Sequence, residues 1–125
     1  MNFKLDTKEK FTVIQLQEPV LSEIMAAEWT SLLLSYLQKD IPHLIINLEQ
    51  VQEISIPMAE SLAVIQQQFY EKECSFVICC LNEKVEATFE EIELLELLNF
   101  TPTESEAWDI VQMEEIEREI LGGEE

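Results

Sequence analysis

Two short apolar runs limit the possible folds of this chain more than any other feature of its sequence. They are His43–Leu48 and Ser75–Leu81, and apolar residues in each run are almost unbroken by polar ones. A run of this length is typical of a strand that is buried on both faces in the middle of a parallel sheet. Because parallel neighbours need a crossover connection, we expect a helix to follow each of these strands.

The segments between and after these runs have the periodicity of helices. Apolar residues three or four positions apart predict a helix after Pro19, a second from about Pro57 to Glu71, a third after the N-cap candidate Asn82 and a last one from Thr103. Thr103 and Glu106 have the spacing of a capping box. The four apolar stripes are Leu21, Ile24, Met25, Trp29, Leu32, Leu33, Tyr36 and Leu37; Met58, Leu62, Ile65 and Phe69; Val85, Phe89, Ile92 and Leu95; and Trp108 and Val111 with Ile116 and Ile120.

The first residues and the length complete the expected fold. Phe3–Leu5 and Phe11–Leu16 are rich in β-formers and predict a hairpin, which adds an antiparallel edge to the sheet. We therefore expect an α/β fold with one mixed, mostly parallel sheet of about four to five strands and about four helices. A chain of 125 residues has the size of one domain. Its core should span about residues 3–121, with Gly122 and Gly123 ending the last helix before a short acidic tail at 122–125.

The charge of the chain restricts its partners. Asp and Glu number 26 against 7 Lys and Arg, giving a formal net charge of -19, which disfavours nucleic acid and anionic lipid surfaces. Hydrophobic residues make up 47% of the chain, so it has enough apolar surface to fold. Neither a secretory signal nor a membrane span is recognisable in the sequence, and we expect a cytoplasmic protein without membrane insertion.

The residue types that commonly act in catalysis or bind metals do not form a recognisable motif in this sequence. His43 is the only histidine, and the sole glycines are Gly122 and Gly123, so neither a histidine-based triad nor a phosphate-binding loop is expected. Cys74, Cys79 and Cys80 are clustered and have the wrong spacing for zinc, which favours buried strand residues over a redox pair. We expect no enzymatic activity, no metal site and no cofactor.

One block of the sequence resembles a known family. Residues 41–51, with Ile54 and the helix start at Pro57, resemble the central block of STAS domains, the family of bacterial anti-sigma-factor antagonists. In that family the loop before the helix carries an Asp-Ser-Ser-Gly-like motif, whose positions fall on Ser55, Ile56, Pro57 and Met58. All four residues differ from the motif. The resemblance therefore implies that the phosphorylated serine is replaced by Ile56, and that a phosphate switch cannot operate there.

Two interpretations of this loop are open. In the first, Ser55, Ile56, Pro57, Met58 and Glu60 form an exposed surface at the helix start that binds a partner protein. In the second, the side chains of Ile56 and Met58 turn inward as core residues, and Ser55 contacts the loop backbone. The glutamates of the last two helices are either a solvated surface, a docking face for a basic partner or, least of all, a cation site.

The resemblance implies a non-catalytic regulatory module that binds a protein. The expected partner is an anti-sigma or kinase-like protein, or another subunit of an assembly. The alternative is an accessory or structural subunit of a transport complex, since some STAS domains resemble parts of lipid or anion transporters. The sequence leaves the oligomeric state and any modification of Ser55 open.

Overall fold

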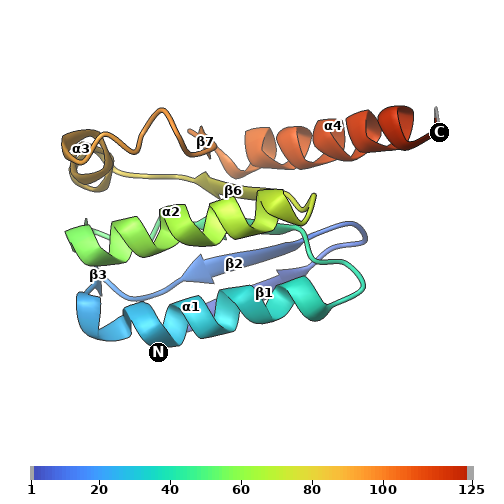
Figure 1. The fold of residues 1–125 in the computed structure, drawn as a ribbon. Helices are drawn as coiled ribbons and strands as arrows, with labels where there is room; N and C mark the ends of the chain where they lie inside the picture. The colour runs from blue at the N-terminus through green and yellow to red at the C-terminus, as the bar shows by residue number, and fades with distance from the viewer. Residues whose placement is uncertain (1, 124–125) are drawn as a thin grey trace.

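The main sheet has five strands in the part of the chain, residues 2–123, that this computed structural model describes (Figure 1). Their spatial order is β1 (Phe3–Thr7), β2 (Thr12–Leu16), β4 (Leu44–Asn47), β6 (Phe76–Cys79) and β7 (Phe100–Thr101). β1 pairs antiparallel with β2, and all other neighbours in this sheet are parallel. The predicted α/β fold with a mixed, mostly parallel sheet and an antiparallel edge is confirmed.

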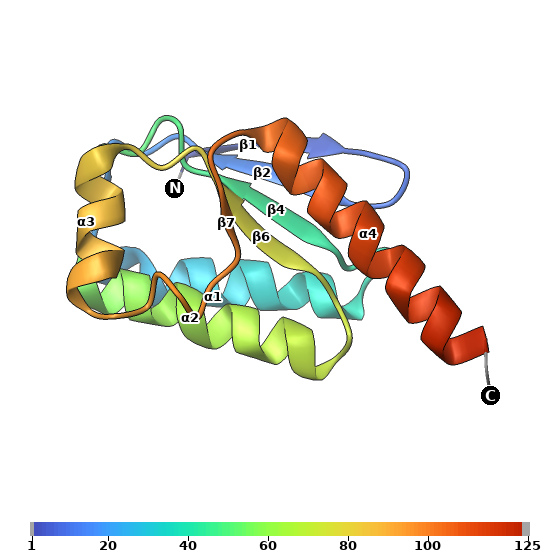
Figure 2. The same ribbon diagram turned by 90° about the horizontal axis from the view of Figure 1, so that it is seen from above.

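Helices cover both faces of this sheet (Figure 2). The helical elements are the 3-10 turns η1 (Glu23–Met25) and η2 (Tyr36–Gln38) and the α-helices α1 (Ala26–Ser35), α2 (Ile56–Glu71), α3 (Glu83–Glu91) and α4 (Glu104–Gly123). α1 and α2 lie side by side on one face, α3 lies at one end of the molecule, and α4 crosses the other face (Figures 1 and 2). The sheet is therefore the middle layer of three.

The central strands are apolar throughout because each face of the sheet meets a different hydrophobic cluster. In β4, Leu44 and Ile46 belong to the large cluster shared with α1, α2 and α3, whereas Ile45 belongs to a smaller cluster under α4. Successive side chains of a strand point to opposite faces, so burial on both faces requires an unbroken apolar run. The sequence interpretation of these strands is thus confirmed.

A second, two-stranded sheet corrects the predicted start of the first helix. β3 (Val20–Leu21) pairs in parallel with β5 (Glu53–Ile54), and the N–H of Ser55 donates to the Leu21 carbonyl at 2.8 Å. Leu21 is therefore a buried strand residue rather than part of the helical stripe. Ile24, also assigned to that stripe, lies in η1 with 88% of its surface exposed, because the regular helix begins only at Ala26.

The end of α4 also differs from the prediction. Ile116 and Ile120 were expected on its apolar, packed side, but they are 54% and 59% exposed. They lie five and nine positions after buried Val111 and are therefore on the opposite side of α4, whose last turns also continue past the edge of the sheet (Figure 2). The helix includes Gly122 and Gly123, where the acidic tail was expected to begin, and residues 124–125 of that tail lie outside the described residues.

Candidate protein-binding site at the start of helix α2

Local capping determines the geometry of the loop between β5 and α2. Ser55 is the N-cap of α2, with extended backbone angles (φ -75°, ψ 154°), and its Oγ accepts a hydrogen bond from the N–H of Met58 at 3.2 Å. Pro57 lies in the first turn, where a missing N–H leaves no helical hydrogen bond unmade. Ser55 and Pro57 together fix where the helix begins and how its first residues point.

The first residues of α2 divide into an outer and an inner group. Ile56 is 41% exposed, Pro57 and Glu60 are exposed, and Ser55 is partly exposed. Met58 has no exposed surface. An exposed isoleucine and proline thus begin the helix, and a buried methionine lies beneath them.

The burial of Met58 corrects the hypothesis that it belongs to an exposed surface. Met58 lies four, seven and eleven residues before Leu62, Ile65 and Phe69, all of which are buried in the large cluster. Residues at this spacing lie on one side of a helix, so the side that packs on the sheet includes Met58. The inward interpretation is right for Met58 and for the backbone contact of Ser55, and wrong for Ile56.

The loop before α2 is also held by the start of α3, a contact that sequence reasoning missed. The Asn82 side chain accepts a hydrogen bond from the N–H of Val85 at 2.8 Å, as the predicted N-cap should, and its Nδ2 donates to the Val51 carbonyl at 3.2 Å. Lys84 forms an ion pair with Glu53 on β5. The starts of α2 and α3 therefore lie at the same end of the molecule (Figure 1).

The cysteines lie in surroundings that disfavour the thiolate. Cys79 is fully buried at the end of β6, and burial raises the pKa of its thiol. Burial also raises the pKa of Cys74 and of Cys80. Cys80 follows the strand with a left-handed φ of 64° and is partly exposed. The prediction of buried strand residues is therefore right for Cys79 and wrong for Cys80. A nucleophilic cysteine needs the opposite electrostatic setting.

His43 and Ser75 begin a polar network under α4. The Nδ1 of His43 accepts a hydrogen bond from the N–H of Ser75 at 3.0 Å, and burial, followed by the charge of Arg118, lowers the pKa of the imidazole. The hydroxyl of Ser75 donates to Glu114 at 2.7 Å and accepts from Arg118 at 3.0 Å. These contacts attach α4 to the sheet, and His43 is structural in this arrangement.

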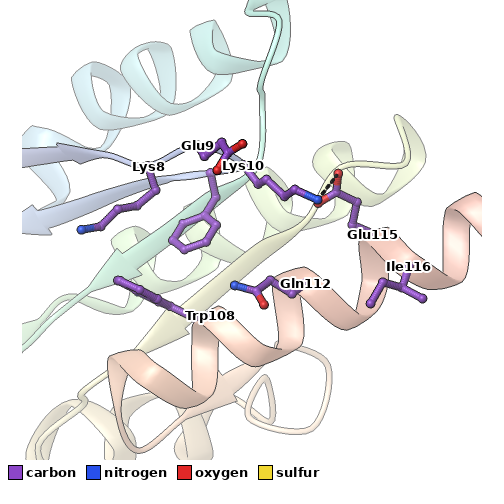
Figure 3. Close-up of a pocket in the computed structure, with 8 residues that line it drawn as sticks. Lys8, Glu9, Lys10, Trp108, Gln112, Glu115 and Ile116 are labelled. Carbon is purple, nitrogen blue, oxygen red and sulfur yellow. Dashed lines mark ion pairs between the residues drawn. The ribbon is translucent and has the colours of Figure 1, made fainter.

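A cavity of about 350 Å³ lies between the β1–β2 turn and α4, away from the start of α2 (Figure 3). The Nζ of Lys8 lies 4.9 Å from the centre of the Trp108 ring, and that of Lys10 lies 3.9 Å from a carboxylate oxygen of Glu115. Both lysines thus already have contacts within the chain.

Two general properties of the described residues bear on the site. Across residues 2–123, His, Cys, Asp and Glu side chains nowhere gather in threes in a way that could hold a metal ion. The helices within the same range are all too short or too polar to cross a membrane.

Comparison with known proteins identifies the family. The sequence model of the STAS domain family matches residues 2–107. The chain belongs to the STAS domain family. A comparison with curated protein sequences gives no match for this STAS domain.

Solved structures share the fold of this STAS domain. A Thermotoga maritima protein described as an anti-sigma factor antagonist has a TM-score of 0.76 and 20% identity, over 88% of this chain and 94% of that chain. Unphosphorylated SpoIIAA, an anti-sigma factor antagonist, has a TM-score of 0.71 and 17% identity, over 89% and 96%. The murine anion transporter Slc26a9 has a TM-score of 0.70 and 12% identity, over 83% of this chain but 18% of that chain.

Proposed function

We propose that this STAS domain is a non-catalytic regulatory module that binds a partner protein through the start of α2, in the manner of an anti-sigma factor antagonist. The observation that carries the proposal is the outward position of Ile56 beside the exposed Pro57 and Glu60. We call these three residues, with Ser55 at their edge, the α2 entrance. The partner is an anti-sigma or kinase-like protein, or a subunit of a larger assembly.

The α2 entrance has the physical properties of a small docking surface. Ile56 supplies apolar area that is removed from water on binding, and each fully buried side chain of this kind contributes about 1.5–3 kcal/mol. Pro57 and the Ser55 cap hold this apolar residue in one orientation before binding, which reduces the entropy cost of association. Buried Met58 supports the surface from below and does not itself contact the partner.

Partner binding at the α2 entrance does not depend on phosphorylation of Ile56, the residue at the family's phosphoserine position. Ile56 has no hydroxyl, and the Ser55 hydroxyl is already engaged as the helix cap. Ser61, the next hydroxyl along the helix, donates to the Pro57 carbonyl at 3.0 Å. We therefore infer a domain that binds its partner constitutively. Phosphopeptide mapping after incubation with a cognate kinase checks this, and a stoichiometric phosphate on Ser55 would contradict it.

A second candidate function is that of an accessory subunit in a transport complex. Its support is the fold shared with the anion transporter, of which this fold makes up a small part. The genes beside this one distinguish the two functions: an anti-sigma factor or phosphatase gene favours regulation, and a permease gene with an ATPase gene favours transport.

The test of the α2 entrance is the substitution Ile56→Asp, with Val64→Asp as a matched control. Val64 is on the same helix and is 53% exposed, so both changes place a carboxylate on the solvated side of α2. A pull-down from an extract of the source organism first supplies the partner. We expect Ile56→Asp to weaken its affinity by about thirty-fold, because the new charge loses its hydration in the complex. Val64→Asp should leave the affinity within about two-fold.

Melting temperatures must accompany the affinities. Both variants should melt within about 2 °C of the unchanged domain, since surface substitutions have small effects on stability. Equal affinities for the two variants would move the partner site away from the α2 entrance.

A further inference from the structure

The outer side of α4 has an apolar stripe that no other described part of the chain covers. Met113, Ile116 and Ile120 are 59%, 54% and 59% exposed, and Leu121 extends the stripe at 68%. The first three residues are spaced three and four positions apart, which places them in one row along the helix. We call Met113, Ile116, Ile120 and Leu121 the α4 stripe.

The opposite side of the same helix already has its partners. Ala107 and Val111 are buried in the small cluster on the sheet, and Glu114 and Arg118 are hydrogen-bonded to Ser75. Since α4 uses this side to attach to the sheet, the α4 stripe faces outward. Figures 1 and 2 both show the last turns of α4 running clear of the other elements.

The charges beside the α4 stripe identify what kind of surface can cover it. Glu117 and Glu119 are exposed along it, and Glu106 and Asp109 are exposed in the preceding turns. Arg118, the one basic residue among 104–123, is directed inward to Ser75 and Glu114. A second copy of this chain would bring its own carboxylates against these, and an anionic membrane surface would be repelled in the same way.

We propose that the α4 stripe is a second docking surface, which binds a basic amphipathic helix of another protein. Such a helix would place its apolar side on Met113, Ile116 and Ile120 and its Lys and Arg residues beside Glu117 and Glu119, a common mode of helix recognition. The stripe lies beyond residues 2–107, which match the family, and the end of α4 is at the opposite end of the molecule from the start of α2 (Figure 1). The inference does not depend on the proposed function of the α2 entrance.

The neighbouring cavity adds a recess for one side chain of the bound helix. Ile116 belongs to the α4 stripe and also lines the cavity of about 350 Å³ (Figure 3). The other apolar residues that line this cavity are Phe11 and Trp108. A large apolar residue of the partner helix fits this recess while the rest of its apolar side lies on the stripe.

The test uses a synthetic amphipathic peptide of about five helical turns, with leucines in one row and lysines elsewhere, labelled for fluorescence anisotropy. A scrambled peptide of the same composition has the same charge but no apolar row. We expect the amphipathic peptide to bind at least tenfold more tightly than the scrambled one, because only it can bury the stripe. The double substitution Ile116→Ser/Ile120→Ser should remove this difference.

Matched variants distinguish binding at the α4 stripe from nonspecific hydrophobic binding and from effects of unfolding. Val64→Ser alters an equally exposed apolar residue on α2 and should leave peptide binding unchanged. Glu117→Gln/Glu119→Gln should weaken binding at low salt and reduce its salt dependence, since exposed charges are screened at higher ionic strength. Far-UV circular dichroism should show the same fold for all variants.

Three results would overturn the inference. Equal affinity for the amphipathic and scrambled peptides would leave only nonspecific charge attraction. Unchanged peptide affinity in the serine double variant would place binding elsewhere on the chain. A concentration-dependent dimer in analytical ultracentrifugation that disappears in the same variant would make a second copy of this chain the occupant of the stripe.

Discussion

The start of α2 and the end of α4 contain similar apolar residues but differ in how many of them are buried. In α2, Met58 has no exposed surface and Ile56 is 41% exposed, so one side of the helix is core and the other is free. In α4, Met113, Ile116 and Ile120 are each more than half exposed. The spacing of apolar residues is helical in both places, yet only α2 has the sheet beneath its row.

The comparison shows that helical spacing of apolar residues identifies an apolar side of the helix, but does not show that this side is buried. A stripe becomes core only where it faces another layer of the fold. The row of α2 faces the sheet, whereas the α4 stripe lies on the side of its helix opposite Ala107 and Val111, which pack on the sheet. Substitutions of equal chemistry should therefore have very unequal effects in the two helices.

The largest expected effect is that of Met58→Asp on stability. The change removes a fully buried side chain and places an unpaired carboxylate in the large cluster, at a cost of about 4 kcal/mol or more. We expect the melting temperature to fall by at least about 10 °C. Differential scanning calorimetry measures it, with Ile56→Asp as the matched change on the exposed side of the same turn.

The comparison between Met58 and Ile56 fails if both aspartate variants melt alike. A large drop for Ile56→Asp would mean that this side chain is also core, and a small drop for Met58→Asp would mean that the first turn of α2 opens at little cost. The second outcome would also weaken the assignment of the α2 entrance as a preorganised surface.

The sequence predicted most of the fold because its strongest signals are local. The apolar runs around Leu44–Asn47 and Phe76–Cys79 are typical of strands buried on both faces, and the N-cap Asn82 has its predicted backbone contact. The pair of β3 and β5 was missed, because each strand has only two residues and gains its register from the other. Such pairing is a long-range contact that no local pattern indicates.

The candidate site could be predicted only in part. The helix start was predicted to within one residue, at Pro57 instead of Ile56, and one of the two interpretations included a contact between Ser55 and the backbone. The side of the helix on which Met58 lies could also have been found, because its spacing to Leu62, Ile65 and Phe69 places it in the buried row. The exposure of Ile116 and Ile120 could have been found in the same way, because they lie five and nine positions after buried Val111, which places them on the opposite side of the helix.

A smaller effect is expected where α4 is attached to the sheet. Ser75→Ala removes the hydroxyl that donates to Glu114 at 2.7 Å and accepts from Arg118 at 3.0 Å, leaving both partly buried charges short of a partner. We expect a loss of about 2 kcal/mol. Hydrogen exchange should quicken most at the amides of α4, whereas the exchange of α2 should change less.

Ser105→Ala is the matched control, since Ser105 is exposed in the first turns of the same helix. It should leave exchange in α4 nearly unchanged. Equal acceleration of α2 and α4 by Ser75→Ala would show that the two helices open together, and the contrast between them would then apply to their surfaces but not to their attachment.

The smallest expected effect is a pH dependence that arises at His43, below α4. Burial and Arg118 lower the pKa of the imidazole, Glu115 and Glu114 oppose them, and Nδ1 accepts the Ser75 N–H only while it carries no proton. Because the folded pKa lies below the ordinary value of about 6.5, the contribution to stability is complete above that pH and is lost as the pH falls. In His43→Asn the amide oxygen can accept the same hydrogen bond without titrating.

Urea unfolding of both proteins at about pH 7.5 and about pH 5.5 isolates the effect of this one group, since the many carboxylates are common to both. On acidification, the unchanged domain should lose stability relative to His43→Asn, by at most about 1.4 kcal/mol per pH unit for one proton. The reverse trend would mean that Glu114 and Glu115 outweigh burial and Arg118. The attachment of α4 would then tighten as the imidazole takes up its proton, and α4 rather than α2 would be the helix that acid stabilises.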